Sequence, residues 1–550
     1  MKFLKHTSLI ILTFLLSLTL MNFSTMKSDL FEMTKNLELF TNIFRELEAH
    51  YVDEISPDKL VTTGIDAMLN SLDPYTNFIS ESDMSSYRLQ TTGKYGGVGA
   101  LIRKNEEYVI IAEPYEGFPA HKVDLRAGDK LLKIDGKSVK GKNTNDISKL
   151  LKGSPNTKVD IVVERLGESK PLTKTIEREE IKIESVPYYG MLNDKTGYIT
   201  LTSFTENCSE DVGNALQELK EKHNIESVVL DLRSNPGGLL TEAINVANIF
   251  LPRGEMIVST KGRDYKEKKD YKSKQKPIDT EIPLAILIDR GSASASEIVA
   301  GVMQDYDRAI VIGKRSFGKG LVQTTKNVAF NNKVKMTTAK YYLPSDRCIQ
   351  AINYSGKYGD NPEKVPDSLR TAFKTSTGRI VYDAGGIDPD IETKNQEYSN
   401  IAISLIQKQL VFDYATKYRQ ENESIPMPDK FELTDQDFDK FVAFLANKKY
   451  DYETSSERLL EKLKENAEKE NYLTAIESEL TDLKNKIKHD KKQDLQKFKS
   501  ELKQLLEYEI VMRYHFQKGE IQEALEDDKS VKEALSVLGS NTKYRQLLKK

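Results

Sequence analysis

The chain has 550 residues, a length that suits about two to four domains. Charged residues make up 30% of it and hydrophobic residues 38%, the composition of a core-forming protein with a charge-rich surface. The net charge of −3 argues against a nucleic-acid partner. The two cysteines, Cys208 and Cys348, lack metal-ligand spacing, and we expect buried free thiols, with a single bridge between them left open.

Residues 1–28 resemble an export segment. Lys2 and Lys5 precede an apolar stretch from Leu9 to Leu20, the arrangement of a signal peptide. This stretch is shorter than the roughly 20 residues of a membrane span. The sequence therefore predicts an exported protein of the cell envelope, either periplasmic or anchored to the outer side of the inner membrane. A cleaved signal peptide and an uncleaved anchor remain alternatives.

Two differently patterned regions follow. Residues 29–88 have helical periodicity, with Leu37, Phe40 and Leu47 on one face of a predicted helix. In residues 89–168, short strands such as "YVIIAEPY" and "KVDIVVER" are separated by Gly, Asp and Pro. The stretch "NDISKLLKG" is typical of a helix between two of these strands. We predict a helical region followed by a small mixed domain.

Residues 169–395 have the pattern of an α/β domain. Four apolar, β-branched runs read as buried strands, and two of them lead into helical patterns through tight loops. The runs are "TGYITLTSF", "ESVVLDLRS", "PLAILIDRG" and "RAIVIGKRS". Between them, the lysine-dense "KGRDYKEKKDYKSKQKP" is interpreted as a solvated hairpin, with a binding patch as the alternative.

Residues 396–550 contain few glycines and many charges. Leucine and isoleucine recur at spacings of three and four from Leu473 to Ile487, and again from Leu495 to Leu505. These repeats predict amphipathic helices, with a helical hairpin as one arrangement that the pattern leaves open. Such helices would pack on the enzyme body or on a second copy of the chain, so a homodimer stays open.

The stretch "ILIDRGSASASEIVAG" predicts a buried strand followed directly by a helix that begins among three serines. Ser292, Ser294 and Ser296 are each placed to cap that helix, which is the structural interpretation. A hydroxyl there would also be a nucleophile, because the helix dipole and free backbone N–H groups stabilise developing negative charge.

A nucleophilic serine needs a base, and lysine fits this sequence better than histidine. None of the six histidines lies in the strand–loop–helix units. In "GKRSFGKG", Lys319 stands between Gly318 and Gly320, where the chain can turn tightly. Burial would lower the pKa of its amine, and Gln323 would orient it. The alternative is a phosphate-binding loop, but Gly320 replaces the required Ser or Thr and a strand-like stretch follows.

The turn in "DLRSNPGGLL" supplies a third candidate element. Gly237 and Gly238 can direct a backbone N–H toward a substrate carbonyl. An ordinary strand-to-helix connection is the simpler interpretation of this stretch alone.

Together these stretches resemble the carboxyl-terminal processing (tail-specific) serine peptidases. The matching segments occur in the family's order across roughly residues 35–395, and they include "SLDPYTNFI", "YGGVGA", "PAHKVDLRAGDKLLKIDG", "VVLDLRSNPGGLL", "GSASASEIVAG" and "GKRSFGKGLVQ". The resemblance implies an α/β fold: a crotonase/ClpP-like protease core with an inserted PDZ domain, flanked by N-terminal helices and a C-terminal helical extension.

The same resemblance implies roles for individual residues. Ser294 would be the nucleophile, Lys319 the general base and Gln323 its orienting partner. The Gly237 or Gly238 amide and the Ala295 amide would form the oxyanion hole. No metal or cofactor is implied. The PDZ loop that binds the carboxylate of a substrate tail would comprise Gly96, Gly97, Val98, Gly99 and Ala100.

The implied partners are proteins or peptides with accessible C-terminal tails. Lys152 stands where family members often carry Arg, so the resemblance leaves PDZ gating of the protease open. His121 stands where Lys or Glu is commoner, and we expect it at the surface. A PDZ-type tail-binding scaffold with a silent protease core is the alternative function.

Overall fold

The computed structural model describes residues 30–263, 268–354, 363–394, 397–487 and 491–549. The predicted export segment 1–28 lies outside these ranges. No helix within them combines the length and apolar character that crossing a membrane requires. The chain divides into two units, Met1–Phe78 and Ile79–Lys550, which are described separately.

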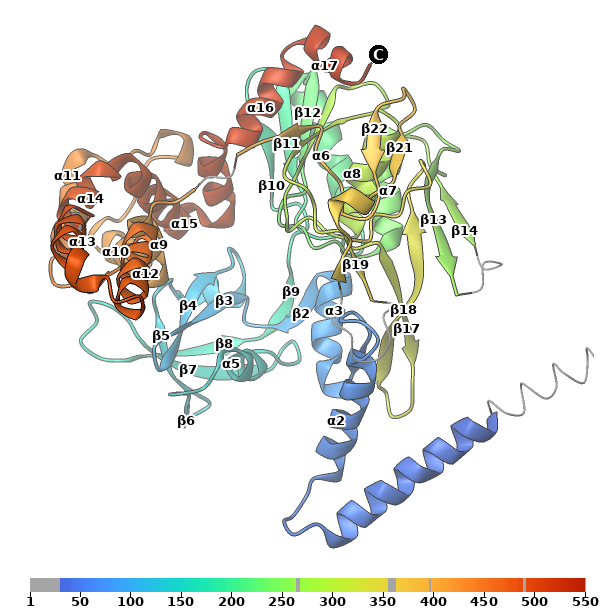
Figure 1. The fold of residues 1–550 in the computed structure, drawn as a ribbon, viewed down its shortest axis with the longest axis horizontal. Helices are drawn as coiled ribbons and strands as arrows, with labels where there is room; N and C mark the ends of the chain where they lie inside the picture. The colour runs from blue at the N-terminus through green and yellow to red at the C-terminus, as the bar shows by residue number, and fades with distance from the viewer. Residues whose placement is uncertain (1–29, 264–267, 355–362, 395–396, 488–490, 550) are drawn as a thin grey trace, which may run out of the picture. The chain divides into compact units, whose positions relative to one another are not determined.

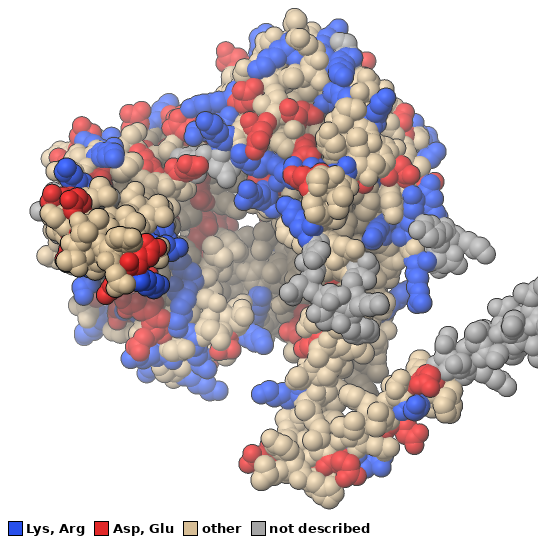
Figure 2. Space-filling view, in the orientation of Figure 1, with Lys and Arg blue, Asp and Glu red and all other residues tan. Residues whose placement is uncertain are grey.

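The first unit is helical, as predicted. It contains a helix over residues 30–50 and α2 (Pro57–Asn70), and strand β1 (Asn77–Ile79) spans its boundary. Ser56 caps α2, and Pro57 occupies the first turn, where a missing N–H costs nothing. On the face that Figure 2 shows, residues other than Lys, Arg, Asp and Glu make up most of this unit's helical surface. Its exposed apolar side chains include Leu30, Phe31, Leu37, Phe40, Ile43, Leu47 and Met68.

The second unit begins with η1 (Glu81–Asp83) and α3 (Met84–Thr92), and then enters an inserted module. Strand β2 (Lys94–Gly97) leads into the module and pairs antiparallel with β9 (Glu179–Lys182), which leads out of it. The two ends of the insertion therefore leave and rejoin the chain at one two-stranded ladder (Figure 1).

The inserted module is a six-stranded sheet with a helix packed on it. Its strand order is β3-β4-β5-β7-β8, with β6 (Lys137–Ser138) paired to β5. The sheet includes β8, so it continues beyond residue 168. Val109, Ile111, Leu131 and Ile161 form part of its core. The elements are β3 (Ala100–Asn105), β4 (Tyr108–Pro114), α4 (Pro119–Lys122), β5 (Lys130–Ile134), α5 (Thr144–Leu151), β7 (Lys158–Glu164) and β8 (Leu172–Glu177).

The α/β core is built on a six-stranded sheet in the order β10-β11-β12-β15-β16-β23. Pairing is parallel from β11 to β23, whereas β10 is antiparallel to β11. The four strands and two helices predicted in this region are confirmed. The elements are β10 (Tyr188–Met191), β11 (Thr196–Thr200), α6 (Cys208–His223), β12 (Ser227–Asp231), α7 (Leu240–Phe250), β15 (Leu284–Ile288), α8 (Ala295–Asp305), β16 (Ile310–Gly313) and β23 (Ile391–Glu392).

Both faces of this sheet are covered, which explains why its strands are continuously apolar. Val228 and Leu230 of β12 face a core shared with α6, α7 and α8. Val229, which alternates with them, faces a separate core that includes Val531 and Val537. Those residues belong to α16 (Lys529–Leu538), which lies with α17 (Asn541–Leu547) on the second face (Figure 1).

A second sheet lies beside the core. β13 (Met256–Gly262) and β14 (Lys269–Lys272) are antiparallel, which confirms the predicted lysine-rich hairpin, although residues 264–267 at its tip lie outside the described residues. β17 (Leu321–Asn327) pairs with β18 (Lys333–Tyr342), and β18 pairs with β13. Short ladders complete the region: β19 (Ile352–Asn353) with β20 (Glu363–Lys364), and β21 (Ala372–Lys374) with β22 (Ile380–Tyr382). Cys208 is buried, Cys348 is partly buried, and both are free thiols.

The C-terminal extension is helical, as predicted, and has its own core of Leu405, Phe438, Phe441 and Leu506. Glu461 of α12 and Lys484 of α13 form an ion pair, so these two helices lie side by side as a hairpin. The elements are α9 (Asn400–Gln407), α10 (Leu410–Glu421), η4 (Pro428–Lys430), α11 (Asp435–Leu445), α12 (Ser455–Lys469), α13 (Leu473–Ile487), α14 (Lys491–Lys497) and α15 (Lys499–Leu525).

Because α16 seals one face of the core sheet, a charge in its buried seam should destabilise the whole core. We expect Val537→Asp to lower the free energy of unfolding by about 3 kcal/mol or more, since the new carboxylate would be buried without a partner. The matched control is Ser536→Asp on the exposed side of the same helix, where Lys543 lies nearby. Urea denaturation of both variants measures the difference, and equal midpoints would show that α16 is not part of the core.

Candidate active site

The structure distinguishes the three serines at the start of α8. Ser292 and Ser296 are fully buried. Ser292 Oγ donates to the Leu232 carbonyl at 2.7 Å, and Ser296 Oγ donates to the Asn235 carbonyl at 2.9 Å. Both hydroxyls therefore tie the start of α8 to the "DLRSNPGG" segment. Ser294, between them, is partly exposed.

Ser294 also has an unusual backbone conformation. Its φ is 54° and its ψ is −110°, a region that residues with a side chain rarely occupy, and it immediately precedes the first turn of α8. Such strain costs about 1–3 kcal/mol and persists only where the surrounding structure imposes it. Here the strain lifts one serine out of the turn and leaves the Ala295 N–H at the positive end of the helix dipole.

The turn at Gly237 and Gly238 lies directly against Ser294. A Cβ on Gly237 would lie 2.9 Å from Ser294 Cβ and 2.8 Å from Ala295 N, so no larger residue fits. The Gly237 N–H already donates to Asn235 Oδ1 at 2.9 Å. Among the described residues, the Gly238 N–H has no hydrogen-bond partner. The turn thus leaves one donor unoccupied, at the residue that follows the contact between Gly237 and Ser294.

Glu297 connects this helix start to the lysine loop. Its side chain is fully buried and accepts four hydrogen bonds. Oε2 accepts from Ser294 N at 2.8 Å and Lys319 N at 2.9 Å. Oε1 accepts from Gly318 N at 2.7 Å and Ser316 Oγ at 2.5 Å. One carboxylate oxygen is therefore shared by the backbones of Ser294 and Lys319.

An ionised carboxylate suits these four donors, because it only accepts hydrogen bonds. Burial raises the pKa of Glu297 above its ordinary value, while the hydrogen bonds from Ser316, Lys319, Gly318 and Ser294 act in the opposite direction. The Ser316 hydroxyl donates to Glu297 Oε1 and accepts from Ile387 N at 2.6 Å, so it connects the carboxylate to the segment at Ile387.

The glycines of the lysine loop are required by close packing. A Cβ on Gly318, where φ is 91°, would lie 2.4 Å from Ala351 Cβ, and one on Gly320 would lie 2.8 Å from Gln350 N. Gly320 N donates to Gln350 Oε1 at 2.7 Å. β17 then begins at Leu321, so a strand follows the loop, whereas a phosphate-binding loop opens a helix.

Gln323 lies on β17, a short way beyond Lys319. Its Nε2 donates to Thr337 Oγ1 of β18 at 3.1 Å, which leaves the side-chain oxygen as the group that can accept from an amine. Lys319 itself is partly buried. The structure therefore brings the predicted serine and the lysine loop together at Glu297, with the glycine turn packed against the serine. Gln323 lies on β17, the strand that follows the lysine loop.

Sequence reasoning missed Glu297, although its signal was visible. "SASE" is a Ser-x-x-Glu capping box, in which the Glu reaches back to the N-cap N–H. Tyr341 was also missed: it is fully buried, and its hydroxyl donates to the Ser294 carbonyl at 3.3 Å. No local pattern identifies Tyr341, because its role depends on where β18 packs.

Of the five residues predicted to bind the substrate tail, Gly96 and Gly97 lie at the end of β2, where they pair with β9, so they are not part of a loop. The loop itself is Val98 and Gly99, and Ala100 begins β3. Gly99 has a φ of 74°, and the Val98 and Gly99 carbonyls accept from Ala120 N at 2.8 Å and Tyr115 N at 2.9 Å, which fixes the loop. β3 is an edge strand of its sheet, so one side of its backbone is open to an added strand. A cavity of about 180 Å³ runs between β3 and α5 and is lined by Val98, Ala100, Ile102, Tyr115, Ser148 and Leu151.

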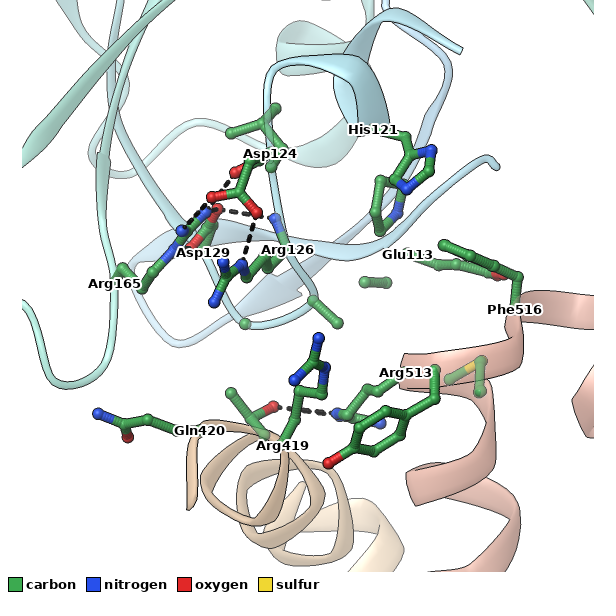
Figure 3. Close-up of a pocket in the computed structure, with 18 of the residues that line it drawn as sticks. Glu113, His121, Asp124, Arg126, Asp129, Arg165, Arg419, Gln420, Arg513 and Phe516 are labelled. Carbon is green, nitrogen blue, oxygen red and sulfur yellow. Dashed lines mark hydrogen bonds and ion pairs between the residues drawn. The ribbon is translucent and has the colours of Figure 1, made fainter. Parts of the chain in front are cut away.

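A second cavity, of about 440 Å³, lies between the inserted module and helices α10 and α15 (Figure 3). Arg165 bridges Asp124 and Asp129 at 2.8 and 2.7 Å, which fixes the loop after α4. His121 is exposed, as predicted, and its ring meets Phe516 edge-on at 5.0 Å. Burial raises the pKa of Glu113 to about 7. These contacts join the inserted module to the C-terminal extension. No residue of the serine site lines this cavity.

The partly exposed serine, the lysine loop and the inserted edge-strand module define a peptidase with a PDZ domain. Peptidase family S41 matches residues 195–356, the PDZ domain family matches residues 110–165, and the C-terminal helical domain of PDZ-proteases matches residues 401–538. The chain belongs to peptidase family S41, and it is a member of the carboxy-terminal-processing proteases within it.

Relatives and a solved structure show how far the similarity extends. The chain is 38% identical to a carboxy-terminal-processing protease of Bartonella bacilliformis, over 58% of this chain and 73% of the relative. It is 31% identical to a CtpA-like serine protease of Staphylococcus aureus, over 78% of this chain and 85% of the relative. The solved photosystem II D1 C-terminal processing protease is 28% identical, with a TM-score of 0.36, over 65% of this chain and 92% of that chain.

Glu297 joins the start of α8 to the lysine loop through its carboxylate oxygens. We therefore expect stability and activity to depend on its carboxylate group more than on the size of its side chain. Glu297→Gln keeps the size but points an NH₂ group at two existing donors, and each donor left unpaired costs about 1–3 kcal/mol. We expect lower stability in urea and a loss of peptidase activity of about 100-fold, since small misplacements of reacting groups have effects of that size. The control Glu281→Gln, on an exposed loop, should change neither. Wild-type activity in Glu297→Gln would contradict this role.

Proposed function

We propose that the protein is a serine endopeptidase that cleaves substrate proteins near their C-termini, with Ser294 as nucleophile and Lys319 as general base. The observation that carries this proposal is Glu297 Oε2, which accepts from the backbone N–H groups of both residues. The names of the relatives support the same class of reaction.

In the proposed reaction, Ser294 Oγ attacks the scissile carbonyl while Lys319 Nζ takes its proton. Lys319 then passes that proton to the leaving amine as the peptide bond breaks. A water molecule, deprotonated by the same lysine, next attacks the acyl-enzyme ester, and the lysine returns this proton to Ser294 Oγ as the ester bond breaks. The Ala295 and Gly238 N–H groups would stabilise the negative charge on the carbonyl oxygen. Gln323 would hold the amine through its side-chain oxygen. This chemistry needs the Lys319 amine in its neutral form.

We further propose that the PDZ domain selects the substrate by its C-terminal tail. The loop at Val98 and Gly99, between β2 and β3, offers backbone N–H groups suited to a carboxylate. The open edge of β3 offers pairing to an extended chain, and the cavity beside α5 would take an apolar side chain of the tail. These features also fit a tail-binding scaffold with a silent core, which catalytic turnover would exclude.

The cell envelope is the proposed location. The support is the charged and apolar pattern of residues 1–28, which would export the chain or anchor it to the outer side of the inner membrane.

The assignment of the nucleophile predicts different results for three neighbouring serines. Ser294→Ala should abolish cleavage of an unstructured protein, a loss of about 1000-fold or more, because no covalent intermediate can form. Lys319→Ala should do the same. Ser292→Ala and Ser296→Ala should remain active but lose about 1 kcal/mol of stability each with their buried hydrogen bonds. Mass spectrometry of the products measures cleavage, and an active Ser294→Ala protein would disprove the assignment.

The tail-reading role predicts that a free C-terminal carboxylate matters for binding. A peptide substrate amidated at its C-terminus should show a KM about tenfold higher or more, with kcat little changed, because charge-assisted hydrogen bonds to the loop are lost. Steady-state kinetics on matched acid and amide peptides test this. Equal KM values would mean that the loop does not read the carboxylate.

A further inference from the structure

The backbone of β3 exposes its hydrogen-bonding groups at alternate residues. Asn105 and Tyr108 close the two-residue turn between β3 and β4, and Arg103 lies opposite Ile110. Residues on an antiparallel strand alternate between pairing inward and facing outward. Ala100, Ile102 and Lys104 therefore direct their N–H and C=O groups to the open edge, and each is one rung for an added strand.

The third of these rungs is already occupied. Gln409 Nε2 donates to the Lys104 carbonyl at 3.2 Å. Gln409 belongs to the C-terminal extension, between α9 and α10, and its φ of 59° places it at the N-cap of α10. A side-chain amide of the extension thus takes the place that the N–H of an added strand would have.

The helix behind Gln409 is packed firmly against the same strand. The Arg103 guanidinium lies 3.5 Å from the centre of the Phe412 ring, and Arg513 of α15 lies 4.3 Å from the same centre. Leu410 and Phe412 are buried, so the start of α10 is held in place. The start of α10 therefore contacts the end of β3 that is remote from the carboxylate loop.

We propose that Gln409 is a specificity-determining residue that limits strand pairing of the substrate tail to the rungs at Ala100 and Ile102. An extended tail that covers Ala100 to Arg103 comprises about four residues at about 3.3 Å each. Residues upstream of these must turn away from the sheet, and the protease therefore reads only a short C-terminal segment. This inference rests on the proposed tail-reading role of the PDZ domain.

The test compares tail peptides of four and eight residues that share their last four residues. Binding is measured by fluorescence anisotropy to the full-length chain carrying Ser294→Ala, so that no peptide is cleaved. With Gln409 intact, the two peptides should bind within about twofold of each other. Adding Gln409→Gly, which suits the positive φ, opens the third rung, and the eight-residue peptide should then bind about three- to tenfold more tightly, the value of one added hydrogen bond.

Two further variants make the test specific. Gln409→Asn also tolerates the positive φ but has a shorter side chain, and it should behave like Gln409→Gly. Gln407→Ala, on an exposed neighbouring position, should behave like the unsubstituted protein. The inference is wrong if the eight-residue peptide binds much more tightly than the four-residue peptide with Gln409 intact, or if the two still bind equally after Gln409→Gly. In either case the proposed tail-reading role would stand, because the peptides still bind. If neither peptide binds in any variant, the tail-reading role fails and the inference falls with it.

Discussion

The buried carboxylate of Glu297 is the interaction on which the geometry of the candidate active site depends. It fixes the strained backbone of Ser294 on one side and the turn at Gly318 and Lys319 on the other. A carboxylate has two acceptor oxygens and can take all four of these hydrogen bonds, whereas an amide would place an NH₂ group against two of the donors. The free energy that holds Ser294 in its rare conformation therefore comes from the same contact that positions the lysine loop, and a change at either segment is transmitted to the other.

The C-terminal extension, which no active-site motif explains, has two physical roles in the fold. Its last helices cover one face of the core sheet, whose strands would otherwise expose apolar residues such as Val229 and Ile310. Asp528, at the start of α16, also binds Arg233 at 2.5 Å, next to the turn that carries Gly237. Earlier in the extension, α10 covers one end of β3. The extension is thus joined to both the protease core and the PDZ domain.

The sequence predicted the elements better than the contacts between them. The apolar runs in the core and the helical periodicity near the C-terminus are local signals, and the structure confirms the strands and helices that they indicated. The choice of Ser294 over Ser292 and Ser296 came from family resemblance, because the three serines share one local pattern. Only packing shows that two of them are buried. The contacts of Tyr341, α16 and Gln409 join residues far apart in the chain, so no window of sequence contains them.

The central claim is that Ser294 is a nucleophile activated by the arrangement that Glu297 holds together. Labelling with a fluorophosphonate, which forms a covalent bond with activated serines, tests it most directly. The account predicts one adduct per chain, on Ser294, formed at a rate that drops sharply after either Lys319→Ala or Glu297→Gln. An adduct on another residue, or a rate on Ser294 that neither substitution changes, would contradict it.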